Sequence, residues 1–194
     1  IAKAHTWFAP GLRGLAKGER AMANWDEDTV TMSVEAARDC MTGLDRDDIA
    51  AVYMASTTFP FQDRQNAGIV ADVLALKSGI MTLDVGSSQR AGTSGLSIAL
   101  QTSAAANNTT LLVTSDKRRT KAASPLEMTT GDGAAALLLG QGNVIAKHLG
   151  SHTEAVDFVD HYRDENNNYD YGWEERWIRD EGYLKIAPAA INAL

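Results

Sequence analysis

The amino-acid sequence predicts an α/β domain built on a mixed, mainly parallel five-stranded sheet. Short apolar runs alternate with segments whose apolar residues recur at helical spacing, and this alternation is typical of strand–helix–strand units with parallel strands. The last two apolar runs, residues 133–140 and 143–149, are separated only by Gln141-Gly142. Such a short polar connection indicates a hairpin, which makes the last pair of strands antiparallel.

The individual elements follow from local patterns. Asp26, Glu27 and Asp28 precede a segment of helical periodicity, and acidic residues favour the positive end of a helix. Gly43 indicates where that helix ends. The other predicted elements are strands at residues 49–55, 80–85 and 109–115, helices at residues 67–76 and 91–106, and the two hairpin strands.

The sequence changes character after residue 150. Residues 1–150 carry the predicted α/β domain, whereas residues 151–194 combine many acidic residues with Tyr and Trp side chains. Such a segment is poor core material by itself, and we expect it to link or to form an interface. Because the chain begins without Met and its last helix, from Lys185, stops without a cap, we expect it to lead into a second half that is absent here.

Composition excludes several classes of protein. A formal net charge of −7 argues against a broad nucleic-acid-binding surface. No apolar run is long enough to span a membrane, and no signal-peptide pattern begins the chain. Cys40 is the single cysteine, and the four histidines show no metal-ligand spacing. We therefore expect a cytoplasmic protein with no metal in this chain and no nucleic-acid or membrane partner.

The stretch from Leu83 to Leu96 carries the strongest chemical signal. A predicted strand ends there and a helix of small residues begins, with Gln89 just before the helix. Free N–H groups and the macrodipole favour negative charge at a helix N-terminus. A cysteine at this position would be a good nucleophile, because the helix end lowers a thiol pKa. A glutamine has no titratable proton and forms no thioester.

Five short motifs follow one another in a fixed order between residues 20 and 145. They are Asp26-Glu27-Asp28-Thr29, Ala51-Val52-Tyr53-Met54-Ala55-Ser56, Phe59-Pro60-Phe61, Gln89-Arg90-Ala91-Gly92-Thr93 and Gly131-Asp132-Gly133-Ala134-Ala135-Ala136. Together they resemble the N-terminal half of the thiolase superfamily, and in particular its hydroxymethylglutaryl-CoA synthase branch. The resemblance implies a thiolase-like βαβαβαββ half-fold, of which two similar copies make the complete protein.

The resemblance also implies positions for a site. The nucleophilic cysteine of the family falls at Gln89, and the glutamate acid/base of the synthase branch falls near Thr57, so both positions are substituted here. The catalytic histidine would lie in the second half. The implied substrate is a coenzyme A thioester. Arg118 and Arg119 are candidates for binding a CoA phosphate, with a solvated turn as the alternative.

The resemblance further implies partners. Members of the family form dimers, so we expect a homodimer or a heterodimer with a thiolase-like subunit. The small residues Ala91, Gly92, Ser94 and Gly95 suit close helix packing, and we expect a bulky residue at Gly92 to disrupt it. A small zinc-ribbon and OB-fold protein is a second implied partner.

Three hypotheses about function remain open at this point. In the first, the chain is a subunit of an acyl-CoA carbon–carbon bond-forming or bond-cleaving system that lacks its own covalent nucleophile, and a partner subunit keeps the cysteine. In the second, it is a non-covalent acyl-CoA lyase or decarboxylase that uses an oxyanion hole at the Gln89 helix start. In the third, it is a purely structural interaction subunit, and whether the chain is an enzyme is therefore open.

Overall fold

The computed structural model of the protein describes Trp7, residues 9–15 and residues 17–194. Residues 1–6, Phe8 and Ala16 lie outside this description, and so does the predicted beginning of the first domain at residue 1. The chain divides into two compact units. One contains the residues up to Arg118 together with Ala122–Val144, and the other contains Arg119–Lys121 together with Ile145–Leu194. The domain boundary placed after residue 150 from the sequence stays a prediction.

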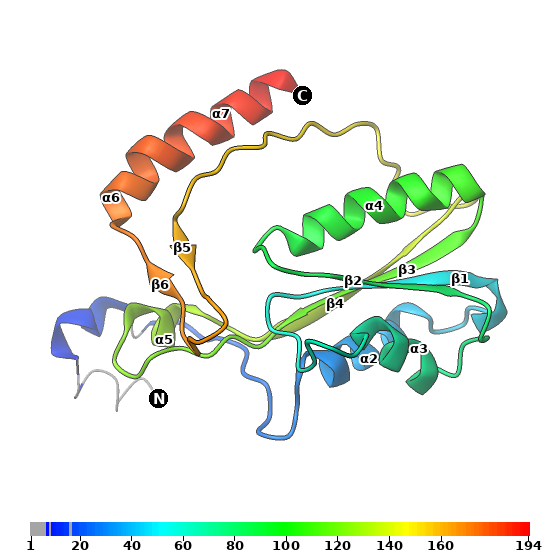
Figure 1. Ribbon diagram of the computed structural model, residues 1–194, viewed down its shortest axis with the longest axis horizontal. Helices are drawn as coiled ribbons and strands as arrows, with labels where there is room; N and C mark the ends of the chain where they lie inside the picture. Colours follow the sequence, from blue (N-terminus) through cyan, green and yellow to red (C-terminus); the bar gives the residue numbers. More distant parts are fainter. Residues whose placement is uncertain (1–6, 8, 16) are drawn as a thin grey trace. The chain divides into compact units, whose positions relative to one another are not determined.

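The first unit is built on a four-stranded sheet in the order β2-β1-β3-β4, which Figure 1 shows edge-on. The strands are β1 (Ile49–Ala55), β2 (Met81–Val85), β3 (Thr109–Asp116) and β4 (Gly133–Leu139). β1 pairs in parallel with both β2 and β3, and β4 pairs antiparallel with β3. The mixed, mainly parallel α/β class expected from the sequence is therefore confirmed.

The fifth strand expected at residues 143–149 is wrong, because this segment forms no strand. Its apolar side chains are exposed, with Ile145 at 109% and Leu149 at 91%. The two-residue turns that close tight hairpins need a positive φ at their first central residue. Gln141 is not among the residues with positive φ, whereas Gly142 has φ +116°. The turn therefore does not direct the chain back along β4.

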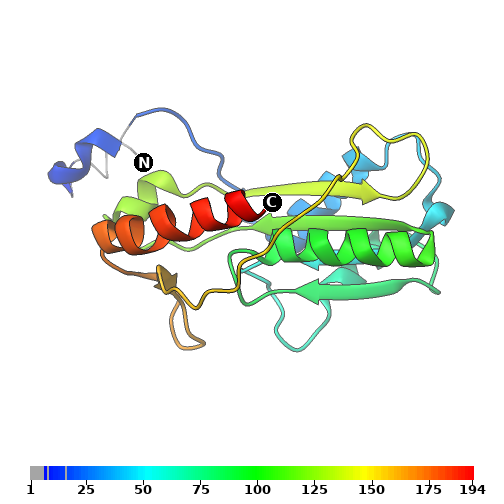
Figure 2. The same cartoon turned by 90° about the horizontal axis from the view of Figure 1, so that it is seen from above.

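Helices cover both faces of this sheet and give three layers (Figure 1). α2 (Thr29–Cys40) and α3 (Asn66–Val73) lie on one face, and α4 (Ala91–Ala106) lies on the other. Figure 2 shows α4 running along the strands. Val52, Leu111 and Val113 pack into the core on the α2–α3 side, and Tyr53 and Leu112 pack with Ala99 of α4 on the other. Among the described helices none has the length and apolarity to cross a membrane.

The segment before α2 has no regular structure, yet several hydrogen bonds hold it to the end of the sheet. Arg20 Nη1 donates to the carbonyl oxygen of Thr130, and the amide of Ala23 donates to Asp132 Oδ2 at 2.9 Å. Lys117 Nζ donates to the carbonyl oxygens of Asn24 and Glu27. α2 then begins at an N-cap formed by Asp28, whose carboxylate accepts from Thr31 N, so the helix start expected near Asp28 is confirmed.

Gly95 is the point at which α4 lies closest to the sheet. A Cβ atom built on Gly95 would lie 3.1 Å from Leu112 Cδ1 and 3.5 Å from the Cβ of Ala55. A Cβ on Gly92 would lie 3.5 Å from Thr114 Cγ2, which is an ordinary contact. The helix is therefore packed as closely as its small residues suggested, but Gly95 rather than Gly92 is the tight position.

We expect Gly95→Val to destabilise the first unit and Gly92→Ala to leave it unchanged or slightly more stable. Forcing a branched side chain between α4 and β3 overpacks the core, which costs about 1–3 kcal/mol. Alanine at position 92 meets only an ordinary contact and is favoured over glycine inside a helix. Thermal unfolding followed by circular dichroism measures both variants. Equal midpoints for Gly95→Val and the wild-type chain would contradict the close approach.

The second unit is small. It contains a two-stranded antiparallel ribbon of β5 (His161–Tyr162) and β6 (Tyr171–Gly172), followed by α6 (Glu175–Trp177), the π-helical η3 (Ile178–Tyr183) and α7 (Leu184–Ala193). Its aromatic rings contact one another: Phe158 stacks on Trp177 at 4.3 Å, and Trp173 lies 6.1 Å from Trp177. The remaining short elements, η1 (Pro10–Leu15), η2 (Arg46–Asp48) and α5 (Pro125–Thr129), belong to the first unit.

Candidate functional site

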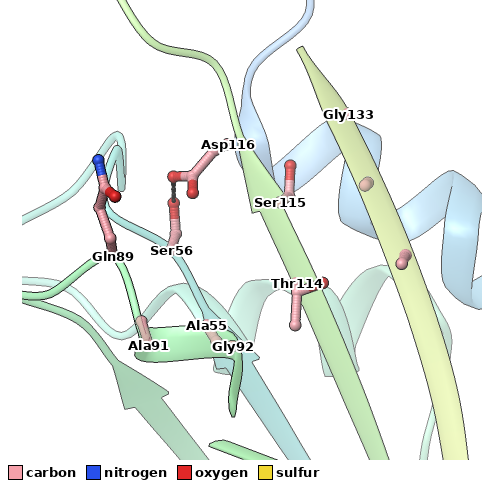
Figure 3. Close-up of a pocket in the computed structure, with 11 residues that line it drawn as sticks. Ala55, Ser56, Gln89, Ala91, Gly92, Thr114, Ser115, Asp116 and Gly133 are labelled. Carbon is pink, nitrogen blue, oxygen red and sulfur yellow. Dashed lines mark hydrogen bonds between the residues drawn. The ribbon is translucent and has the colours of Figure 1, made fainter. Parts of the chain in front are cut away.

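A pocket of about 440 Å³ lies in the first unit, where β1 and β3 end and α4 begins (Figure 3). This edge of a parallel sheet is where open α/β folds bind their ligands. Most of its lining residues are small, including Ala91 and Gly92 of α4 and Ala134 of β4. The polar groups at its β1 and α4 sides are Gln89 and Ser56, and Asp116 contributes a carboxylate from the end of β3.

Gln89 lies in the turn between β2 and α4, two residues before the helix begins. The turn contains Ser87 in the left-handed region, with φ 67°, a conformation that residues with a side chain rarely adopt. The N-cap residue, Arg90, makes no side-chain capping bond, and Ala91 and Gly92 of the first helical turn line the pocket. The sequence-based placement of Gln89 at a helix start beside a site thus agrees with the structure.

Asp116 is the centre of a hydrogen-bond cluster at the end of β3. Its Oδ1 atom accepts from Ser56 Oγ at 3.1 Å, from Thr57 N at 2.7 Å, from Thr57 Oγ1 at 2.9 Å and from Thr58 Oγ1 at 3.0 Å. Thr58 Oγ1 in turn accepts from the amide of Lys117. The turn after β1 and the end of β3 are therefore fastened to each other through one carboxylate oxygen.

Thr57 does not line the pocket, but it holds Asp116, which does. Both its amide and its hydroxyl donate to Asp116 Oδ1, and the preceding residue, Ser56, is buried in the pocket wall. The sequence singled out position 57 and missed Asp116. The available signal was topological: Ser56 and Asp116 each follow a predicted strand, and the carboxyl ends of neighbouring parallel strands meet at one edge of the sheet.

The boundary between the two units falls within the basic cluster. Arg118 is half-buried in the first unit, whereas Arg119 is exposed and belongs to the second. Neither lines the pocket. The neighbouring Lys117 is engaged internally, because its Nζ donates to the carbonyl oxygens of Asn24 and Glu27. The assignment of Arg118 and Arg119 to a CoA phosphate stays a prediction.

Cys40 does not line the pocket. It is on α2, which covers the face of the sheet opposite to α4, and it packs against the core on that side. Burial raises the pKa of the Cys40 thiol, and a weaker opposing effect comes from a hydrogen bond with the backbone of Leu138. A raised thiol pKa leaves less thiolate at neutral pH, so Cys40 is poorly suited to act as a nucleophile.

We expect Cys40 to be alkylated slowly in the folded chain. At pH 7 its rate with iodoacetamide should be about tenfold or more below that of a free thiol, since the thiolate is both scarce and shielded. The rate should rise as the pH is raised, and it should reach the free-thiol value after unfolding in urea. Mass spectrometry of quenched samples measures this, and a folded rate equal to that of glutathione would contradict it.

In the described part of the chain, no group of three or more His, Cys, Asp or Glu side chains is arranged to hold a metal ion. Two of the histidines instead face single carboxylates in the second unit. His152 Nε2 lies 2.8 Å from Glu154 Oε1, and His161 Nδ1 lies 2.7 Å from Asp160 Oδ1.

Comparison with known proteins finds curated relatives that share one name. Hydroxymethylglutaryl-CoA synthase of Methanosphaera stadtmanae is 32% identical over 188 residues, which cover 94% of this chain and 53% of the relative. The enzyme of the same name from Methanocaldococcus jannaschii is 31% identical over 160 residues, which cover 81% and 46%. Over most of its own length the chain is thus similar to hydroxymethylglutaryl-CoA synthases. No protein-family model matches the chain.

A crystal structure of a hydroxymethylglutaryl-CoA synthase complexed with CoA has the same fold. It matches with a TM-score of 0.83 at 20% identity, covering 99% of this chain and 50% of that one. The thiolase-like half-fold expected from the motifs is thereby confirmed. The chain spans about half the length of the curated synthases that it matches. The roles of positions 89 and 57 as nucleophile and acid/base positions stay predictions.

Proposed function

We propose that this chain is part of a thiolase-superfamily system that forms or cleaves carbon–carbon bonds on acyl-CoA, and that it binds the acyl thioester without becoming acylated. The observation that carries the proposal is the pocket at the start of α4, where the turn presents Gln89 instead of a nucleophile. The relatives named hydroxymethylglutaryl-CoA synthase support the substrate class.

The chemistry available in this pocket is polar but not nucleophilic. The first turn of α4 begins without a side-chain cap, and the amide of Ala91 donates to the carbonyl oxygen of Ser88. The positive end of the helix suits the carbonyl oxygen of a thioester or the oxygen of an enolate. The Gln89 amide can donate or accept a hydrogen bond, and it carries no proton that it could give up at neutral pH. Binding and polarisation of a thioester are therefore expected, and transfer of an acyl group onto the protein is not.

The proposal assigns the missing covalent step to another subunit. A thiolase-like partner that keeps a cysteine at the matching turn would form the acyl-enzyme, in a dimer with this chain. A small zinc-ribbon and OB-fold protein is a further proposed partner. Arg118 is the remaining candidate for a CoA phosphate within the first unit, and the proposed setting for all of these is the cytoplasm.

A specific observation favours a second candidate function. Asp116 places a carboxylate in the pocket that holds Gln89. A non-covalent lyase or decarboxylase needs an oxyanion site and an acid/base rather than a nucleophile. In that case the chain would work in a homomeric assembly. A purely structural role, the third possibility, predicts that no acyl-CoA binds.

Two measurements test the proposal. Native mass spectrometry of the complex purified from its own source shows whether a second thiolase-like subunit accompanies this chain. Isothermal titration with acetyl-CoA and with CoA shows whether the chain binds the thioester. A cysteine-bearing partner together with binding supports the non-catalytic subunit, and copies of this chain alone together with binding support the lyase or decarboxylase. Absence of acetyl-CoA binding would refute both.

A further inference from the structure

We infer that Asp116 is the acid/base group of the pocket and exchanges protons with the α-carbon of the bound acyl thioester. The inference rests on the proposed function, since it requires a thioester in this pocket. It starts from the hydrogen bonds of a single carboxylate, whose two oxygens have different surroundings.

The Oδ1 atom of Asp116 is fully engaged. It accepts four hydrogen bonds, from the hydroxyls of Ser56, Thr57 and Thr58 and from the amide of Thr57. The hydroxyl of Ser56 is buried, and its residue is 2% exposed. An oxygen held by four donors from one turn is fixed in position, as a catalytic group must be before it can transfer a proton to a defined atom.

The Oδ2 atom has no hydrogen bond from the described residues, while the side chain as a whole lines the pocket. Figure 3 shows the carboxylate reaching from the end of β3 towards Ser56, with Gln89 on the far side of Ser56. One oxygen is therefore an anchor, and the other is left for a ligand.

Asp116 is also the one titratable side chain among the residues that line the pocket in the described part of the chain. The others are alanine, glycine, serine, threonine and Gln89. Chemistry at the carbon next to a thioester carbonyl begins or ends with a proton transfer at that carbon. A carboxylate on the pocket wall, beside a helix start suited to the enolate oxygen, supplies the group that Thr57 and Gln89 do not.

The proposed step balances without a further reactant. Asp116 Oδ2 takes a proton from the α-carbon, so that the C–H bond breaks and an O–H bond forms. The electron pair of the C–H bond moves into the enolate, whose negative charge rests on the former carbonyl oxygen. In the reverse step the same carboxyl group returns the proton. In D₂O the carboxyl proton exchanges with solvent, and a deuteron is returned to the carbon.

Deuterium exchange tests the step directly. The full chain is incubated with acetyl-CoA in D₂O, deuterium in the acetyl group is measured by mass spectrometry, and binding of acetyl-CoA is measured in parallel. We expect the wild-type chain to catalyse exchange and Asp116→Asn to slow it by about 100-fold or more, the contribution typical of a general base, with affinity changed less than about threefold. Asparagine keeps an Oδ1 acceptor for the four donors, so the anchor survives. Asp72→Asn, the same change at an exposed position on α3, is the matched control and should keep the full rate.

The outcomes separate this inference from the proposed function. If the wild-type chain binds acetyl-CoA but exchanges no deuterium, or if Asp116→Asn exchanges as fast as the wild type, Asp116 is not the acid/base although the thioester site stands. If the wild-type chain does not bind acetyl-CoA, both the role of Asp116 and the proposed function are refuted. If Asp116→Asn does not fold, Asp116→Glu replaces it. That variant keeps a carboxylate but moves it by one methylene, and it should bind normally while exchanging at least about tenfold more slowly. An unchanged rate in that variant overturns the inference.

Discussion

Gln89→Cys is expected to gain a reactive thiol and no acyl-transfer turnover. The introduced thiol would lie at the start of α4, where the helix end lowers its pKa, whereas burial raises that of Cys40. Its alkylation at neutral pH should be about 10–100-fold faster than that of Cys40, because each unit of thiol pKa changes the thiolate fraction tenfold. The resemblance places the acid/base of condensation near Thr57, after β1, whereas Asp116 ends β3. Proton transfer at Asp116 therefore does not replace the carboxylate missing near Thr57, and condensation should not follow.

Mass spectrometry of iodoacetamide-treated samples gives the two alkylation rates, and chromatographic detection of free CoA gives turnover from acetyl-CoA and acetoacetyl-CoA. Gln89→Ser, which introduces a hydroxyl of similar size to the thiol, is the control for changes in the turn itself. Robust acyl transfer by Gln89→Cys alone would show that the pocket needs only a nucleophile. It would contradict the expectation that a carboxylate near position 57 is also required.

The second large effect is expected at Asp84, which lies one residue before the end of β2 and caps α3 from outside the helix. Its Oδ2 accepts from Asn66 N at 2.7 Å and from Asn66 Nδ2 at 2.9 Å, and its Oδ1 accepts from Ala67 N at 2.7 Å. Both partner residues are buried, at 1% and 0% exposure. Asp84→Ala would remove the acceptor of the buried amides of Asn66 and Ala67, while Asn66 Nδ2 keeps the carbonyl oxygens of Phe61 and Arg64. We expect it to lower the free energy of unfolding by about 3–5 kcal/mol.

Urea unfolding of the wild-type chain, Asp84→Ala and Asp84→Asn measures this effect. Asparagine keeps one acceptor oxygen and loses the charge, so its destabilisation should be intermediate. Asp72→Asn, at an exposed position on α3, should change the free energy by less than about 0.5 kcal/mol. A free energy of unfolding for Asp84→Ala within that same margin would mean that α3 is capped in another way.

The elements that could be predicted from the sequence are those whose pattern is local. β1 has the bounds expected for it, residues 49–55, because a continuous apolar run indicates a strand buried on both faces. α4 likewise spans residues 91–106, as expected from its small apolar residues. The start of α2 was predictable from Asp28, because an N-cap acts on residues only a few positions along the chain.

The features that were missed depend on contacts between distant residues or on turn geometry. α3 has no side-chain cap of its own, since Gln65 makes none and Asp84 supplies it from 18 residues further along. Asp116 gains its place in the site only when β1 and β3 lie side by side, 59 residues apart at its bond with Thr57. The absent fifth strand depends on the sign of one backbone angle at Gln141, which composition does not reveal.

The anchored segment before α2 has a consequence for how the chain is digested. A protease needs a stretch of peptide that can detach and extend into its active site. Residues 20–27 lack regular structure, but Arg20, Ala23 and Asn24 are each tied to the end of β3 or to the loop before β4. Cleavage there requires these hydrogen bonds to break first. Trypsin acting at Arg20 therefore reports on local opening of the contact with the loop before β4, which leads into the strand beside the pocket.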